Sequence, residues 1–282
     1  MGILKWKFGA GKIRKNFVGL AVIIVVLVGV VAWQGIIIYK NRGRVDFDLG
    51  RQSCNVARIN IYGELVTYGA GRLDANRNVE DKTSADDVVA AIKKAKGDKS
   101  VKAIMLAVDS GGGSGVAAEE IVVALKDAGK PTAAVIRDAG DSAAYWAVSG
   151  CDRIFASDNS DVGSIGITMS YLDNVNKNQS DGLTYNQLSV GKFKDSGDPD
   201  KPLTEAERQL FMRDVNIEYN NFIKDVATNR NMSIEAVKNL ADGSTMLGKL
   251  ALDSGLIDQI GGIFEAQKYI SQKIGKGAVV CN

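Results

Sequence analysis

Apolar runs alternate with amphipathic stretches in the part of the chain that follows its first fifty-odd residues. The run VARINIYGEL (56–65) alternates apolar and polar side chains until Gly63, which is typical of a strand. Apolar runs at 102–110 and 130–139 also predict strands, and residues 116–129 between them repeat apolar side chains with helical spacing. This order predicts a parallel α/β sheet whose functional residues gather at the carboxyl ends of the strands.

Two further helices have recognisable starts. Residues 84–97 form an amphipathic stretch that Ser84 can cap, and residues 203–230 open with a capping box made by Thr204 and Glu207. The second helix carries an apolar stripe along one side. Three more strands are predicted at 153–157, 163–171 and 183–191.

Residues 17–39 depart from this pattern, because they are apolar throughout and contain no charged side chain. Such a segment is long enough to cross a bilayer, which predicts one transmembrane anchor. Basic side chains dominate residues 1–16 and favour a cytoplasmic N-terminus, with residues 40–55 as a stalk and 56–282 as an extracytoplasmic domain. The end of the segment lacks the small-x-small pattern of a signal-peptide cleavage site, so we expect the anchor to be retained.

The composition excludes several kinds of site. The chain has no histidine, so it cannot form a Ser-His-Asp triad, a Cys-His dyad or a His-ligated metal site. A net charge of +2 without an arginine-rich run gives no nucleic-acid surface. Cys54, Cys151 and Cys281 lack metal-ligand spacing; Cys151 fits a small buried side chain, and a bridge between the other two is one alternative.

Ser142 lies in RDAGDSAAYWAVSG (137–150), between an acidic turn and the start of a predicted helix. This context is similar to a strand-to-helix turn that exposes a nucleophile. Without histidine, the plausible base for a serine is a lysine that desolvation keeps neutral near pH 7. The glycine run DSGGGSG (109–115) fits a flexible loop or an oxyanion hole better than a phosphate cradle, since the P-loop and GxGxxG patterns are absent.

Several separated motifs occur together in this chain: VDSGGGSG, RDAGDSAAYWAVSGCDRIFAS, VGSIGI, LSVGKFKD and NLADGSTMLGKLALDSGLIDQIGG. In order and spacing they resemble the bacterial signal peptide peptidase A (SppA) family over residues 56–269 and the anchor. The resemblance implies a membrane-anchored serine peptidase with a Ser/Lys dyad and no cofactor. It also implies an α/β, Clp-protease/crotonase-like ββα superhelical domain that assembles into homo-oligomeric rings, in which neighbouring protomers complete each site.

By this resemblance Ser142 is the nucleophile and Lys194, in GKFKD, is the general base. Lys192 is the rival, but only Lys194 keeps the lysine-aspartate pair and the family spacing. Ser164, in VGSIGI, matches the hydroxyl that orients the lysine. We expect the oxyanion donors to be the backbone N–H groups of Gly112, Gly113 and Ala143.

The chain departs from the family pattern in two places. The family commonly has Asn-Ser-Pro-Gly-Gly where this chain has residues 109–113, and Ala-Ser-Gly-Gly where it has 141–144. The second exchange places the carboxylate of Asp141 beside the nucleophile, where it favours the charged form of a lysine base. Both exchanges bear on activity rather than on the fold.

The leading hypothesis is a serine endopeptidase of the bacterial cytoplasmic membrane that degrades cleaved signal peptides or other short hydrophobic peptides. An alternative is a non-catalytic crotonase-like scaffold tethered to the membrane. Acyl-CoA chemistry is disfavoured, because an extracytoplasmic domain would not meet coenzyme A. A reactive-serine probe separates the first hypothesis from the other two.

Overall fold

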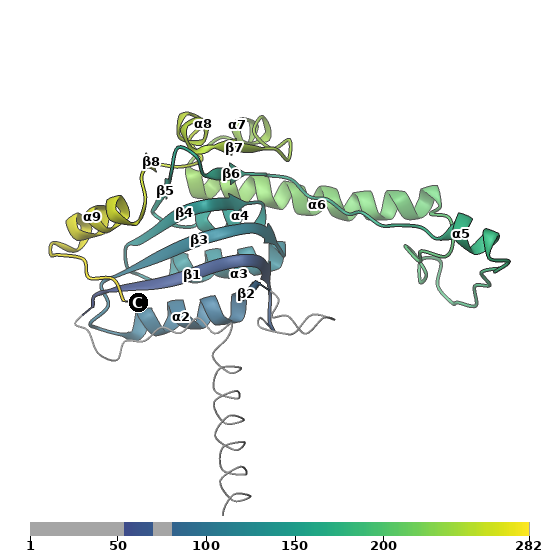
Figure 1. The fold of residues 1–282 in the computed structure, drawn as a ribbon, viewed down its shortest axis with the longest axis horizontal. Coiled ribbons are helices and arrows are strands. Elements are labelled where there is room, and N and C mark those ends of the chain that lie inside the picture. Colours follow the sequence, from purple (N-terminus) through teal and green to yellow (C-terminus); the bar gives the residue numbers. More distant parts are fainter. Residues whose placement is uncertain (1–53, 70–80, 282) are drawn as a thin grey trace, which may run out of the picture. The chain divides into compact units, whose positions relative to one another are not determined.

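The computed structural model describes residues 54–69 and 81–281, and within them one sheet runs in the order β2-β1-β3-β4-β5-β8 (Figure 1). Neighbouring strands along this path are parallel, while β6 pairs with β4 and the antiparallel β7 pairs with β6. The predicted parallel α/β architecture is therefore confirmed. The strands are β1 Val56–Val66, β2 Lys82–Ser84, β3 Ala103–Gly113, β4 Thr132–Asp141, β5 Arg153–Ala156, β6 Asp161–Gly163, β7 Thr245–Leu247 and β8 Gln259–Ile260.

The predicted helix starts are also confirmed. Ser84 caps its helix by accepting the Asp87 N–H, and Thr204 and Glu207 form the expected capping box. The helices are α2 Ala85–Gly97, α3 Gly115–Asp127, α4 Ala143–Ser149, α5 Val175–Ser180, α6 Glu205–Arg230, α7 Ile234–Lys238, α8 Gly248–Asp253 and α9 Ile263–Ile274.

The core lies on both faces of the central strands. On one face Met105 and Val135 pack with Ile270 of α9 in a single buried cluster. Because side chains alternate along a strand, Ile104 and Leu106 point to the opposite face, on the side of α2, α3 and α4, and they are fully buried. A sheet buried on both faces is rigid at its centre, so residues at its carboxyl edge have fixed positions.

Helix α6 joins this core to a projecting segment. Its C-terminal half is buried, with Phe222 stacked on Trp146 of α4 at a centroid distance of 4.6 Å. Phe211 and Val215, on the same apolar stripe, are only half-buried. Toward its N-terminus α6 extends beyond the sheet to residues 170–201, here called the arm, which include α5 (Figure 1).

Two of the predicted strands are wrong. Residues 183–191 form no strand, and of 163–171 only Gly163 belongs to one, at the end of β6. Apolar side chains in these runs are exposed instead: Leu188 is 99% and Val190 is 96% accessible. The alternation of apolar and polar residues in these runs therefore does not mark a strand that packs one face on the core, because the apolar side chains are exposed in the single chain.

The basic segment 1–16, the anchor 17–39 and all but the end of the stalk 40–55 lie outside the described residues. Within residues 54–69 and 81–281, no helix is both long and apolar enough to cross a membrane. The anchor, the stalk and the domain boundaries therefore stay predictions.

A disulfide joins Cys54 to Cys281, across a sequence separation of 227 residues. The C-terminal segment returns alongside β1, where Cys281 donates its N–H to the Val56 carbonyl at 2.9 Å. Cys151 is a free thiol and is buried, as predicted. The bridge thus fastens both ends of the described domain to the amino edge of the sheet.

Replacing both bridge residues, as Cys54→Ser with Cys281→Ser, should lower the free energy of unfolding by about 2–4 kcal/mol, because the unfolded chain regains the entropy of a long loop. Thermal unfolding with and without reductant measures this. Reductant should lower the Tm of the natural chain and leave that of the double variant unchanged. Equal Tm values for the natural chain under both conditions would contradict a stabilising bridge.

Candidate active site

Ser142 occupies a strained turn between β4 and α4. Its backbone has φ 52° and ψ −126°, a conformation that side-chain-bearing residues rarely adopt. The Ser142 N–H donates to the Gly163 carbonyl at 2.8 Å, which holds the turn against β6. Although Ser142 is the N-cap residue of α4, its side chain makes no capping hydrogen bond. The hydroxyl is therefore free for chemistry.

Gly112 makes the closest approach to this turn. With φ +102°, it leaves no room for a side chain: a Cβ there would lie 2.7 Å from the Ser142 Cβ and 2.9 Å from the Ala143 nitrogen. The buried Ser110 hydroxyl fixes this glycine, since it accepts the Gly112 N–H at 3.1 Å and donates to the carbonyl of Gly63. Gly63 is the bulge that breaks the alternation of β1, with φ +60°.

The backbone donors near Ser142 differ in how they are used. Gly112 gives its N–H to Ser110 in this structure. The Ser114 N–H donates to the Leu65 carbonyl on β1, and the two residues before it, Gly112 and Gly113, have φ +102° and +147°, which glycine adopts most readily. Ala143 is the first residue of α4, where backbone N–H groups have no partner within the helix. Of the three expected oxyanion donors, Gly112 is thus engaged with Ser110 in this structure, and the roles of Gly113 and Ala143 stay predictions.

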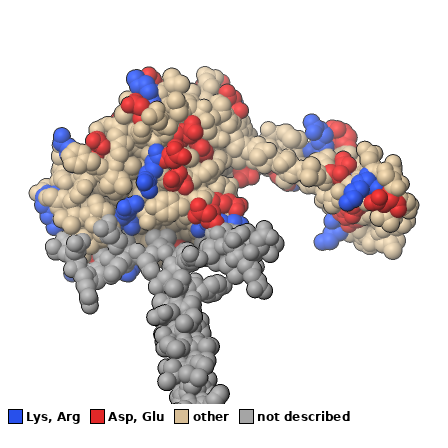
Figure 2. All heavy atoms as spheres, in the orientation of Figure 1, with Lys and Arg blue, Asp and Glu red and all other residues tan. Residues whose placement is uncertain are grey.

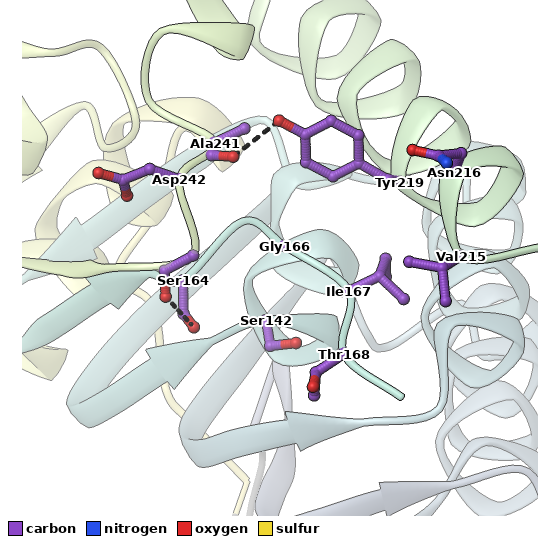
Figure 3. A pocket seen from close by; sticks show the side chains of 11 residues that line it. Ser142, Ser164, Gly166, Ile167, Thr168, Val215, Asn216, Tyr219, Ala241 and Asp242 are labelled. Atoms are coloured by element: carbon purple, nitrogen blue, oxygen red, sulfur yellow. Dashed lines mark hydrogen bonds between the residues drawn. The ribbon is translucent and has the colours of Figure 1, made fainter. Parts of the chain in front are cut away.

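Ser142 opens into a pocket of about 500 Å³ (Figure 3). Figure 3 shows its hydroxyl beside Thr168 and Ile167, with Ser164 on the other side. Tyr219 of α6 closes the far wall and donates its hydroxyl to the Ala241 carbonyl at 2.7 Å. The full lining is Ser142, Ser164, Gly166, Ile167, Thr168, Val215, Asn216, Tyr219, Ala241, Asp242 and Gly243.

Ser164 lies in this pocket, as predicted, and is itself strained, with φ 48°. Its N–H donates to the Ser244 carbonyl at 3.0 Å and its hydroxyl donates to the Gly243 carbonyl at 3.1 Å. The hydroxyl donates its proton to a carbonyl, and its oxygen lone pairs can still accept a hydrogen bond from an amine.

Neither candidate base lies in the pocket. The residues that line it include no lysine. Lys194 is exposed and sits in a turn of the arm, where its N–H donates to the Gly191 carbonyl at 3.1 Å, and Lys192 lies over the ring of Phe193. The arm meets the N-terminal end of α6, near Phe211, whereas the Ser142 pocket borders the middle of that helix. The structure therefore brings together Ser142, Ser164 and the backbone donors, and places Lys194 elsewhere.

Asp141 introduces a carboxyl group next to Ser142. Burial, with a smaller contribution from the carboxylate of Asp161 on β6, raises the pKa of Asp141 to about 6. Its Oδ1 atom is buried and has no hydrogen-bond partner among the described residues. Above pH 6 a partly desolvated negative charge thus lies beside Ser142.

Sequence patterns did not single out several pocket residues. Val215 and Tyr219 are four residues apart on the apolar stripe of α6, so the stripe could have indicated that both side chains lie on the same side of the helix and line one pocket. The loop at 241–243 belongs to a quoted motif, but its role was not apparent. There the Asp242 carboxylate accepts the N–H of Ser244 at 2.9 Å and so shapes the turn beside Ser164. Across residues 54–69 and 81–281, no group of three or more His, Cys, Asp or Glu side chains is placed to hold a metal ion.

The model of peptidase family S49 matches residues 124–276, which is more than half of the chain. The chain belongs to peptidase family S49. It is a serine-type peptidase, similar to proteins of the SppA family. A protease of Methanocaldococcus jannaschii is 27% identical over 92% of this chain and 83% of its own length. A protein of Enterococcus faecium, named for signal peptide peptidase SppA, is 29% identical over 75% of this chain and 61% of its own length.

Among solved structures, a mutant of ClpP1 from Listeria monocytogenes matches with a TM-score of 0.47 and 14% identity, over 74% of this chain and 92% of that one.

Gly112→Ala should lower the labelling of Ser142 by a fluorophosphonate probe at least about tenfold, because the new Cβ would collide with the Ser142 turn. Gly111→Ala is the matched control, since a Cβ at Gly111 meets nothing within 4 Å. Gel fluorescence after probe treatment measures the labelling, and circular dichroism checks the fold. Equal labelling of the two variants would show that the close approach does not shape the nucleophile.

Proposed function

We propose that this protein is a membrane-anchored endopeptidase in which Ser142 of one chain and Lys194 of a neighbouring chain form each active site. The observation that carries this proposal is the hydroxyl of the half-buried Ser142, held by a strained backbone in a pocket whose lining includes no lysine. A serine hydroxyl is a weak nucleophile until a base accepts its proton. Lys194 is exposed on the arm, and a base that acts on a serine of another subunit must be accessible from outside its own chain.

The proposed reaction is acyl transfer in two steps. The neutral amine of Lys194 takes the proton of Ser142 while the Oγ atom attacks the scissile carbonyl, and the N–H groups of Gly113 and Ala143 stabilise the oxyanion. The protonated lysine then gives that proton to the leaving amine, which releases the first product. Water, deprotonated by the same lysine, attacks the ester on Ser142; the lysine then returns this proton to the Oγ atom as the acid product leaves. Ser164 holds the amine by accepting one of its hydrogen bonds.

The surface of the arm supports assembly with further copies of the chain. Leu172, Leu188 and Val190 are 88%, 99% and 96% exposed. In Figure 2 the arm, at the right, has both blue and red side chains around broad uncharged areas. A monomeric domain rarely leaves such large apolar side chains together in water. We infer that neighbouring protomers cover them in a homo-oligomeric ring with the Clp/crotonase-like arrangement expected of the family.

The pocket supports peptides with hydrophobic side chains as substrates. Ile167, Val215 and Tyr219 give it apolar walls close to the Ser142 hydroxyl. Short hydrophobic peptides, such as cleaved signal peptides, fit these walls, and the Enterococcus faecium relative is named for a signal peptide peptidase.

The disulfide supports a domain outside the cytoplasm. Cys54 and Cys281 are joined, and such bridges persist in oxidising compartments rather than in the cytosol. This agrees with the predicted orientation, in which the basic residues of 1–16 stay in the cytoplasm. We therefore place the peptidase domain on the outer side of a bacterial cytoplasmic membrane, with residues 17–39 as its anchor.

Ser142→Ala and Lys194→Ala should each lower kcat for a fluorogenic hydrophobic peptide by at least about a thousandfold, while Lys192→Ala, the matched control, stays within about threefold.

Assemblies re-formed from equal amounts of the two inactive variants should recover about a quarter of the natural activity, since that share of neighbouring pairs joins an intact lysine to an intact serine. Full activity in Lys194→Ala would overturn the dyad. An inert natural oligomer that also resists fluorophosphonate would favour the scaffold alternative.

Asp141→Asn should move the rising limb of the kcat–pH profile to lower pH, by roughly half a unit or more. Since the pKa of Asp141 is about 6, its carboxylate is ionised at pH 7–9, where a lysine base must lose its proton. The negative charge favours the ammonium form, so its removal makes the neutral amine available at lower pH. Asp138→Asn, an exposed carboxyl on the same strand, is the control. Superimposable profiles for the natural enzyme and Asp141→Asn would contradict this effect.

A further inference from the structure

The turn that carries Lys194 belongs to no helix or strand. Residues 191–198 are held by short-range backbone hydrogen bonds, among them Ser196 N–H to the Phe193 carbonyl and Asp198 N–H to the Asp195 carbonyl, both 3.2 Å. Gly191 begins the turn with φ +102°. Bonds of this kind are exposed to water and exchange readily, so they fix a long side chain poorly. A base that must reach a serine on another chain needs additional support.

Tyr185 supplies that support from outside the turn. Its hydroxyl lies 2.9 Å from Oδ2 of Asp195 and 3.3 Å from Oδ2 of Asp198, so its single proton is shared between a carboxylate at each end of the segment that follows Lys194. Burial, together with hydrogen bonding to these carboxylates, raises the pKa of Tyr185 to about 12. The hydroxyl therefore keeps its proton across the pH range in which a lysine base would work.

The far end of this clamp is fastened to α5 and to the start of α6. Asp198 also accepts the N–H of Asp200 at 2.9 Å, and the Asp200 carboxylate accepts the Asn178 side-chain amide at 2.9 Å. The next residue, Lys201, forms an ion pair with Glu207 of α6 at 2.5 Å, in which the two side chains are only 13% and 7% exposed. The turn is thus held between a tyrosine on one side and a buried ion pair on the other.

We propose that Tyr185 is a positioning residue for Lys194: its hydroxyl, through Asp195 and Asp198, holds the turn so that the amine reaches Ser142 of the neighbouring subunit. This inference rests on the proposed function, because it gives the tyrosine a role only if Lys194 is the base. The geometry is specific, since Asp195 is the residue that directly follows the lysine. Loss of the hydroxyl should misplace the amine without emptying the substrate pocket, which lies on another chain.

Tyr185→Phe removes only the oxygen atom of the clamp. We expect kcat to fall by about tenfold and KM to change by less than about twofold, because misorientation of a catalytic group affects the chemical step rather than binding. Tyr171→Phe, an exposed tyrosine of the same arm, is the matched control and should keep natural kinetics. Asp195→Ala should reproduce the loss, and the double variant with Tyr185→Phe should lose little more. Light scattering must show unchanged assembly.

Mixed assemblies give the decisive test. In a mixture of Ser142→Ala chains and Lys194→Ala chains, only the former supply a working lysine and only the latter a working serine. Tyr185→Phe should lower the recovered activity about tenfold when placed on the Ser142→Ala chain and should have no effect on the Lys194→Ala chain. Equal loss from either placement would mean a general structural role and would overturn the proposal. No recovery in the parent mixture would instead refute shared sites, and with them the basis of this inference.

Discussion

The backbone of Gly112 lies so close to Ser142 that neither segment can move without the other. This contact is prepared from the sheet outward: the bulge at Gly63 turns its carbonyl to the Ser110 hydroxyl, which in turn holds the N–H of Gly112. A buried hydroxyl that both donates and accepts is expensive to disrupt, because breaking either bond leaves a polar group unsatisfied. The strain at φ 52° of Ser142 is thus sustained by hydrogen bonds that begin on a strand two positions away in the sheet.

Helix α6 both lines the Ser142 pocket and carries the arm. Near its middle, Val215 and Tyr219 line the pocket of their own Ser142, while its N-terminal end carries the arm with Lys194. The 26 residues of α6 span about 39 Å, at 1.5 Å per residue. Because its C-terminal half is fixed by the stack of Phe222 on Trp146, the helix is a stiff spacer. In the proposed assembly such a helix would hold Lys194 far from Ser142 of its own chain and at a defined place for a neighbour.

How far the sequence predicts the structure depends on whether a feature is local or long-range. Ser84 and the Thr204–Glu207 box define helix starts through bonds between residues three apart, so they were predictable. Ser142 was recognised from the short stretch GDSA and from the resemblance to the SppA family, neither of which requires a long-range contact. The joining of Cys54 to Cys281 was left open, since sequence spacing does not fix which cysteines meet. The arm misled strand prediction because its apolar side chains face no core within the chain.

The absence of histidine links these features to the way the site works. A lysine acts as a base only when it is desolvated, and an exposed turn on an isolated chain cannot desolvate it. In a single protomer the proposed base, Lys194, is therefore exposed on the arm, and no lysine lines the pocket of Ser142. Docking of the arm would supply burial and proximity in one event, so catalysis would depend on assembly rather than on folding alone. In the proposed arrangement the carboxylate of Asp141 would oppose the neutral amine at that point.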